Sequence, residues 1–293
     1  MTRFTYTHVL WMLCGWLVLA TSCEDPIDVT LDQGEAQVTV DAFINSAVET
    51  QTIRLTMTGG YFDNVPNNGV TDGAVKVIDQ NGNEFPFVHQ SDGFYTWTPD
   101  TVGPYMDQVE TAYTLEITAN GQTYQAISIL NPVPPIDSVT YEFEEAELGQ
   151  PEGYYAQFWG RDFAGRTDFY WVKTFKNGVF DADPGNITIA YDAAFGEGAD
   201  GFVFITPIRE GITPFDEPYE LGDTVNVELH AINEGTWNFI QEMQTQMVNG
   251  GLFATPPANV RTNLENTDAS SSTKAIGYFD ISSVSRGGSI MGQ

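Results

Sequence analysis

The sequence has little positive charge for its length. Lys and Arg together number 11 against 40 Asp and Glu, which gives a formal net charge of −29 at pH 7. Because nucleic acids and anionic membrane surfaces attract basic proteins, this balance argues against either as a partner. Hydrophobic residues make up 42% of the chain and aromatic residues 13%, more than acidic disordered chains contain. The composition therefore indicates a folded protein with a strongly acidic surface.

Cysteine and long apolar runs are also scarce. The two cysteines are Cys14, inside an N-terminal apolar segment, and Cys23, directly after it. A mature chain that begins at Cys23 is expected to contain no disulfide and no thiol chemistry. No later stretch approaches the roughly 18 continuous apolar residues of a transmembrane helix. We therefore expect a soluble body that is tethered to a membrane.

The N-terminal segment predicts a signal peptide over residues 1–22. Arg3 is its only full positive charge, and the 12 apolar residues from Val9 to Ala20 are too few to span a bilayer. The residues before Cys23 resemble the lipobox of bacterial lipoproteins, although Ala20 stands where Leu is usual. This resemblance implies cleavage between Ser22 and Cys23 and acylation (palmitate or a similar chain) of Cys23. The alternative is an ordinary signal peptide with a stray cysteine. An acidic tether follows over residues 23–36.

The next segment alternates apolar and polar residues with the period of a β-strand. Seven short runs, among them Val38–Ile44 and Ile53–Met57, are separated by turn signals such as Asn81-Gly82 and Asn120-Gly121. These features predict an antiparallel Ig-like or fibronectin-like β-sandwich over residues 37–131. The long loop from Gly59 to Gly73 is a candidate contact surface.

A second β-rich domain is predicted over residues 138–286, after a proline-rich linker at 132–137 that cannot continue a ladder. Asn177-Gly178 indicates a further hairpin. Apolar residues recur at helical spacing from Trp237 to Met247, so we expect one helix over about 234–249 with Asn233 as its N-cap. The last residues, 287–293, are expected to fray.

The order of these features is similar to that of one family. The residues that carry the similarity are Cys23 to Asp25, Val38 to Ala42, Asn131 to Val139, Pro256 to Asn263 and Ile276 to Phe279. They resemble the DUF4249 lipoproteins of Bacteroidota outer membranes, a family of unknown function. The resemblance implies a lipid-anchored protein of the outer membrane, exposed on the cell surface, with Glu24 and Asp25 as the surface-export signal. It also implies a partner, because members are commonly encoded beside TonB-dependent receptors, which import bulky nutrients.

Few residues suit catalysis. His89 shares its strand parity with Phe85 and Phe87 and is expected to be packed, whereas His230 falls on the polar parity of its strand and is expected to be exposed. Zinc-ligand spacings, a G-x-S-x-G elbow, a P-loop and a dinucleotide fingerprint are all absent. We therefore predict no catalytic residue, no metal-ligating residue and no enzyme activity.

Two groups of residues are candidates for binding. The acidic runs 181–183 and 197–200 offer oxygen ligands for Ca²⁺ but lack the spacing of a calcium loop, so solvated loop acids are the alternative. No other cofactor is predicted. Aromatic residues gather in the first strands predicted for the second domain, where burial is the default. An outward-facing set would form a platform for a sugar or peptide. These residues are Tyr154, Tyr155, Phe158, Trp159, Phe169, Tyr170 and Trp171.

Three functions remain open from the sequence. The first is a non-catalytic surface lipoprotein, held in the bilayer by acylated Cys23, that captures a ligand as the accessory partner of a TonB-dependent receptor. The second is a free-standing envelope scaffold or adhesion protein. The third is a hydrolase that works through a carboxylate pair.

Overall fold

The computed structural model of the chain describes residues 34–60, 68–191, 209, 211–214, 216–250, 255–256 and 258–292. The predicted cleavage and lipidation residues Ser22 and Cys23 lie outside this part, and so do Glu24 and Asp25. The acidic run 197–200 and residues 61–67 of the predicted contact loop lie outside it as well. These predictions stay predictions.

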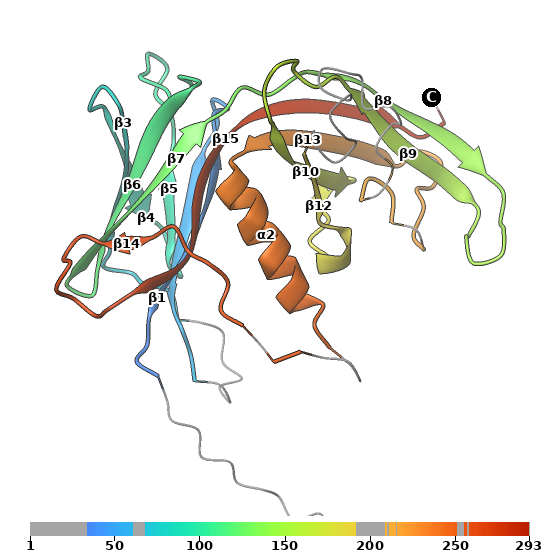
Figure 1. Cartoon of the computed structure of the whole chain (residues 1–293). Coiled ribbons are helices and arrows are strands. Elements are labelled where there is room, and N and C mark those ends of the chain that lie inside the picture. Colours follow the sequence, from blue (N-terminus) through green and yellow to red (C-terminus); the bar gives the residue numbers. More distant parts are fainter. Residues whose placement is uncertain are drawn as a thin grey trace, which may run out of the picture. The chain divides into compact units, whose positions relative to one another are not determined.

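The described residues confirm the mainly β class (Figure 1). Most of the elements are short strands, and one longer helix follows the thirteenth of them. In chain order the elements are β1 (Val38–Asn45), β2 (Gln51–Met57), β3 (Ala74–Asp79), β4 (Glu84–His89), β5 (Phe94–Trp97), β6 (Thr111–Ala119), β7 (Gln122–Leu130), β8 (Ile136–Glu144), β9 (Gly153–Gly160), β10 (Phe169–Lys176), β11 (Val179–Phe180), the short 3-10 helix η1 (Pro184–Asn186), β12 (Thr188–Tyr191), β13 (Thr224–Ile232), α2 (Glu234–Met247), β14 (Glu265–Asn266) and β15 (Ala275–Ile290).

Within the described residues, thirteen strands form one mixed sheet in the order β11-β10-β13-β15-β1-β2-β5-β4-β3-β6-β7-β14, with β12 also paired to β10. The first seven strands pair with one another only in antiparallel fashion. β4 pairs with β3 through residues 84–87 and with β5 through Val88 and His89. The sheet therefore turns at β4, and its two halves enclose one hydrophobic cluster.

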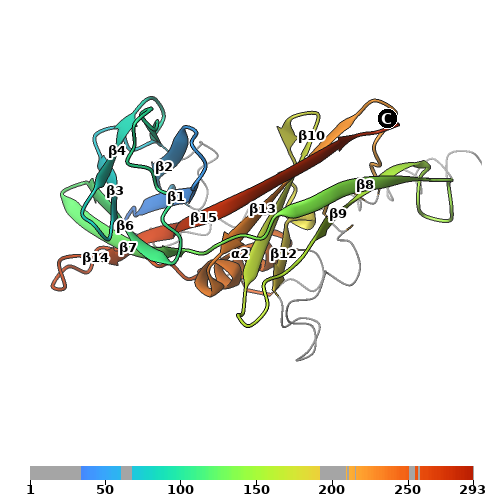
Figure 2. The same ribbon diagram turned by 90° about the horizontal axis from the view of Figure 1, so that it is seen from above.

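β15 joins the two halves of the chain, as Figure 2 shows. Its residues 275–282 pair in parallel with β1, and its residues 283–290 pair antiparallel with β13. The chain thus lies in the sheet as far as Ile290, so the prediction that the tail frays from residue 287 is wrong. The ladder with β13, which begins at the pair Thr224 and Ile290, holds the tail in place.

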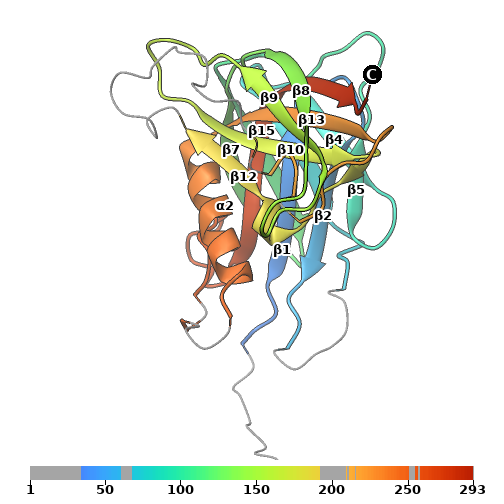
Figure 3. The ribbon, with the colours of Figure 1, turned by 90° about the vertical axis from the view of Figure 1, so that its right-hand side faces the viewer.

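Strands β10, β13 and β15 have both faces covered (Figures 1 and 3). On one face lie β8 and β9, which pair only with each other in the sheet order of the described residues. Apolar residues of this hairpin, such as Phe158, pack with Tyr170 and Leu229 in a second hydrophobic cluster. On the other face lies α2, whose Phe239 and Ile240 pack in a third cluster.

The predicted domain boundary near residue 131 falls between two of these clusters. The first cluster is built from β1 to β7, and it also includes Leu264, Ala275, Phe279 and Ile281 from beyond the proline-rich linker. The second cluster is built from residues 139–231 and Met291. The chain therefore returns from the second half to complete the first core.

Two of the three predicted hairpin turns, at Asn120-Gly121 and Asn177-Gly178, are confirmed as two-residue loops. Asn120 and Gly121 between β6 and β7 both have positive φ, as do Asn177 and Gly178 between β10 and β11. Asn and Gly are favoured there because they tolerate this backbone conformation. The prediction of a two-residue turn at Asn81-Gly82 is wrong, because β3 ends at Asp79 and β4 begins at Glu84. Asp79 organises this longer turn by accepting the backbone N–H groups of residues 81 and 83.

The predicted helix is confirmed, but the role of Asn233 differs. Asn233 occupies the N-cap position of α2 without a side-chain capping bond. Its Nδ2 instead donates to Ser128 Oγ at 2.9 Å and to Asp280 Oδ1 at 3.2 Å. Thr236 Oγ1 donates to the same Asp280 oxygen at 2.6 Å. These four residues, which we call the polar junction, tie β7, α2 and β15 together where the first and third clusters meet.

Candidate functional site

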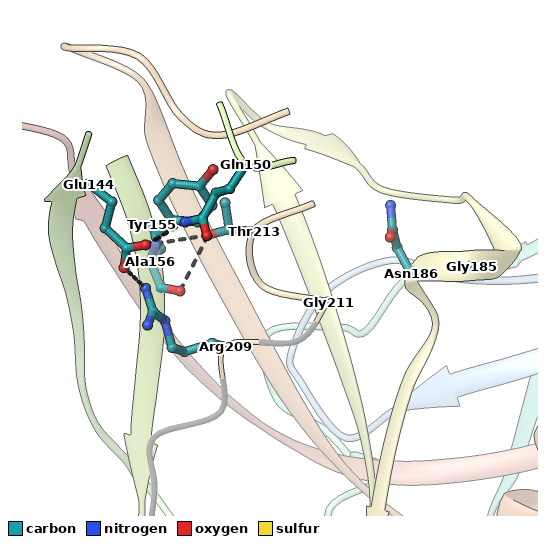
Figure 4. A pocket seen from close by; sticks show the side chains of 9 residues that line it. All are labelled: Glu144, Gln150, Tyr155, Ala156, Gly185, Asn186, Arg209, Gly211 and Thr213. Atoms are coloured by element: carbon teal, nitrogen blue, oxygen red, sulfur yellow. Dashed lines mark hydrogen bonds and ion pairs between the residues drawn. The ribbon is translucent and has the colours of Figure 1, made fainter. Parts of the chain in front are cut away.

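A pocket of about 400 Å³ lies between the β8–β9 hairpin, η1 and the segment before β13 (Figure 4). Side chains of opposite charge, an aromatic ring and exposed backbone line it together. The lining residues are Glu144, Gln150, Tyr155, Ala156, Gly185, Asn186, Arg209, Gly211 and Thr213. We call this the polar pocket.

An ion pair spans one side of the polar pocket. Arg209 Nη2 donates to Glu144 Oε1, and Gln150 Nε2 donates to the other carboxylate oxygen. The hydrogen bond from Arg209 lowers the pKa of Glu144 below its usual range, and the bond from Gln150 adds to this. Glu144 is therefore ionised at neutral pH and is a hydrogen-bond acceptor rather than a proton donor.

Neighbouring contacts fix the wall behind this ion pair. The Arg209 guanidinium lies 5.9 Å from the centre of the Tyr155 ring, and the Tyr155 hydroxyl donates to the backbone oxygen of Pro151. Thr213 Oγ1 accepts from the backbone N–H of Ala156 at 2.8 Å. These bonds attach the segment before β13 to β9, so that Arg209 is presented beside Tyr155 (Figure 4).

The opposite wall is formed by η1 and a glycine. Asp183 caps η1 by accepting from the Gly185 N–H at 2.7 Å, and Asp181 accepts from Asn186 Nδ2 at 3.0 Å. At Gly211, φ is +69° and a Cβ would lie 1.7 Å from Thr188 Oγ1. Only glycine fits this close approach. The pocket therefore depends on tight backbone packing as well as on side chains.

The polar pocket suits recognition of a polar molecule without net charge. Arg209 and Glu144 offer donors and acceptors, and their side chains are 44% and 28% exposed. Because the two charges compensate each other, the pair favours a neutral or zwitterionic ligand over a strongly ionic one. Hydroxyl and amide groups, as in a sugar or a short peptide, match this combination of donors and acceptors.

The structure places His230 in the interior, so the prediction that it is exposed is wrong. Strand parity assigns His230 to the face opposite Leu229, but that face is covered as well, and His230 is 3% exposed. Burial and the nearby charge of Lys173 lower the pKa of His230 to about 4. A hydrogen bond with His230 and another with Arg286 lower the pKa of Glu228 to about 2.

His230 also lies between a serine and a carboxylate, and these three residue types are those of a serine-hydrolase triad. Its Nδ1 lies 2.9 Å from Ser282 Oγ and its Nε2 lies 3.0 Å from Glu228 Oε2. In a working triad the serine reaches substrate. Ser282 is 3% exposed and its hydroxyl lies 3.5 Å from the backbone oxygen of Ile44. The arrangement is therefore a buried hydrogen-bond network that joins β13 to β15.

Of the other described residues singled out by the sequence, only Tyr155 lines the polar pocket, and Asp181 and Asp183 hold η1 beside it. His89 is half-buried, and its ring centre lies 5.1 Å from that of Tyr95. Among the clustered aromatics, Tyr155, Phe158 and Tyr170 are buried. Tyr154 and Trp159 are partly exposed on β9, and Trp159 Nε1 donates to Thr140. The aromatic cluster is thus mainly core.

The acidic run 181–183 contributes to local structure. Asp181 and Asp183 use carboxylate oxygens in the turn bonds around η1. Among the residues that the structure describes, no three His, Cys, Asp or Glu side chains lie together in a group that could hold a metal ion. No helix in the described ranges has the length and apolar character to cross a membrane. Calcium binding stays a prediction.

The structure is that of a mainly β protein with a polar pocket in its second half. The chain belongs to the family described as Domain of unknown function (DUF4249), whose model matches residues 24–287. The predicted DUF4249 membership is therefore confirmed, whereas the lipid anchor, the outer-membrane location and the receptor partner stay predictions. No curated protein matches the chain.

Sequence reasoning missed Glu144 and Arg209. They are 65 positions apart and belong to no motif, so nothing local connects them. Arg209 does stand out as one of only 11 basic residues in a chain with 40 acidic ones.

Proposed function

We propose that this protein is a non-catalytic lipoprotein of the outer membrane that captures a ligand on the cell surface and acts as accessory partner of a TonB-dependent receptor. The anchor in this proposal is acylated Cys23, and the ligand site is the polar pocket. The proposal rests first on one observation, the Glu144–Arg209 pair beside Tyr155 in a pocket of about 400 Å³.

The chemistry of this pair supports capture over catalysis. A carboxyl group that serves as general acid near neutral pH needs a raised pKa, and Arg209 lowers that of Glu144. Binding by a fixed donor and acceptor set needs no proton transfer. A hydroxyl- or amide-rich nutrient, such as an oligosaccharide or a short peptide, fits such a set.

Purification from native membranes tests the partnership. The full chain, tagged at its C-terminus, is extracted in mild detergent, and the proteins and small molecules that co-purify are identified by mass spectrometry. A barrel receptor in stoichiometric amount is expected, together with a small polar molecule that is lost from the Arg209→Gln variant. Recovery of the lipoprotein alone in several detergents would favour the envelope scaffold or adhesion function instead.

Membrane fractionation tests the anchor. Several acyl chains on Cys23 hold a protein at a membrane stably, because each buried CH₂ contributes about 0.8 kcal/mol. The Cys23→Ala variant is therefore expected in the soluble fraction, with Cys14→Ala as the control that stays membrane-bound. Surface exposure is read from protease accessibility in intact cells.

A further inference from the structure

A second cavity, separate from the polar pocket, opens on the other side of the β8–β9 hairpin. It is a groove of about 670 Å³ whose apolar floor includes Phe143, Tyr154 and Leu221. Phe143 is 56% exposed and Leu221 is 73% exposed. Exposed large apolar side chains that gather in one groove indicate a contact surface for another molecule. We call this cavity the acidic groove, for the residues of its rim.

The floor of the acidic groove is held in place by packing. The rings of Phe143 and Tyr154 lie 5.2 Å apart in an edge-to-face arrangement. Tyr154 exchanges two backbone hydrogen bonds with Tyr219, at 2.9 and 3.0 Å. Leu221 contacts the end of the chain, where a Cβ on Gly292 would lie 2.1 Å from its Cδ1. Such a fixed apolar surface loses little conformational entropy when a partner covers it.

Four exposed carboxylates surround this floor. They belong to Glu152, Asp216, Glu217 and Glu220, and none of them forms an ion pair with a cation of the described residues. The one cation among the described residues that line the groove, Lys176, is engaged by Pro218 O at 3.3 Å and by Asp223 Oδ2 at 3.7 Å. The rim therefore carries uncompensated negative charge around apolar side chains.

We infer that the acidic groove docks a basic segment of a partner protein, in which Lys or Arg side chains alternate with apolar ones. The stems of Lys and Arg pack on apolar surfaces while their charged heads reach outward, which matches a floor of Phe143 and Leu221 inside a ring of carboxylates. A second copy of this chain does not match, because its net charge of −29 repels another acidic surface. Anionic lipid does not match for the same reason. The inference deepens the proposed partnership and rests on it only for the identity of the partner.

Photo-crosslinking in living cells tests the groove. The full chain carries p-benzoylphenylalanine in place of Phe143 or Leu221, or, as matched controls, in place of Val88 or Ile127, which are 62% and 64% exposed on the first half of the chain. The expected result is an adduct from the two groove positions only, in which the crosslinked partner segment, sequenced by mass spectrometry, is basic and partly apolar. Combining the probe with Glu217→Lys and Glu220→Lys should reduce the adduct about tenfold. Asp107→Lys with Glu265→Lys, the same charge change at exposed sites elsewhere, should leave its yield unchanged.

Several results would overturn the inference. They are adducts of equal yield from the control positions, an adduct with a second copy or with lipid, a neutral or acidic partner segment, and no adduct. A receptor that co-purifies without crosslinking at the groove would leave the proposed function standing and remove the groove from it. A basic segment from a protein other than a receptor would support the groove and contradict the proposed partnership.

Discussion

The two halves of the molecule use their residues differently. Among the described residues, the first cluster contains 24 buried hydrophobic residues and the second contains 12. The first is enclosed by the antiparallel ladders of β1 to β7 and by the parallel pairing of β15 with β1, whereas residues around the second line both the polar pocket and the acidic groove. Buried polar groups such as Asp162, Asp168 and His230 also lie in the second half. The first half therefore contains the larger hydrophobic core, and the second half contains the two cavities on which the proposed function and the inferred docking groove depend.

The two halves are nevertheless coupled, because β15 runs through both and the polar junction lies between them. Desolvation raises the pKa of Asp280 in this junction, although hydrogen bonds from Thr236, Asn233 and Ser128 oppose the rise. A buried polar group of this kind is costly unless all its bonds are made. Four variants, taken from the largest expected effect to the smallest, test how far stability and recognition are separate.

Gly277→Ala is expected to have the largest effect. Gly277 has φ of +97°, and a Cβ there would lie 1.9 Å from Val40 O, so the parallel pairing of β1 with β15 must open. We expect a loss of roughly 3–5 kcal/mol in the free energy of unfolding, measured with urea. Gly82→Ala, at φ of +82° with open space around it, is the control and should cost only about 1–2 kcal/mol. Equal losses would contradict the close approach of β15 to β1 at Gly277.

The pH dependence of His230 comes next. Its pKa falls from 6.5 in the unfolded chain to about 4 in the folded protein, so the folded state resists protonation. The stability that neutral His230 contributes is present above pH 6.5 and is lost as the pH falls toward 4. The loss between pH 7 and pH 4 amounts to about 3 kcal/mol. Urea unfolding measures the free energy of unfolding at both pH values. Its change between them should be smaller in His230→Gln than in the wild type by about 3 kcal/mol. Identical pH dependence would place His230 in contact with solvent.

Asp280→Ala tests the polar junction. It removes the buried acceptor that Thr236, Ser128 and Asn233 share, although Asn233 Nδ2 keeps Ser128 Oγ and Ile129 O as acceptors. The expected loss in the free energy of unfolding is roughly 2–3 kcal/mol. Asp280→Asn keeps an acceptor oxygen without the charge and should lose less than half as much. If the alanine variant is as stable as the asparagine variant, the junction contributes nothing to the coupling of the two halves.

Glu144→Gln should change stability least. The ion pair with Arg209 is partly exposed, and pairs of this kind contribute about 0–1 kcal/mol. We expect a change below about 1 kcal/mol in the free energy of unfolding, together with loss of the small molecule that co-purifies with the wild type. A large loss of stability with the ligand retained would assign the pair a structural role and break the division between the halves.

Particular elements show what could be predicted before the fold was known. The strands from β1 to β7, α2 and the two-residue turns at Asn120 and Asn177 follow from local periods and from residues that tolerate positive φ. His230 shows the limit of this reasoning. Its strand parity gives the face on which it lies but not whether another element covers that face. Asn233 shows the same limit. Its side chain suits a helix cap, but in the fold it donates to Ser128 and Asp280 instead.

The sequence by itself determined the acidic surface, the mainly β class, the family and the expectation of a lipid anchor at Cys23, because each depends on composition or on residues close together in the chain. Only the tertiary structure decided that β15 pairs with both β1 and β13, that Ser282 and His230 are buried, and that Arg209 meets Glu144 in one pocket. These contacts join residues dozens to hundreds of positions apart. They form only when the packing of whole strands brings these residues together, and no local sequence pattern predicts that packing.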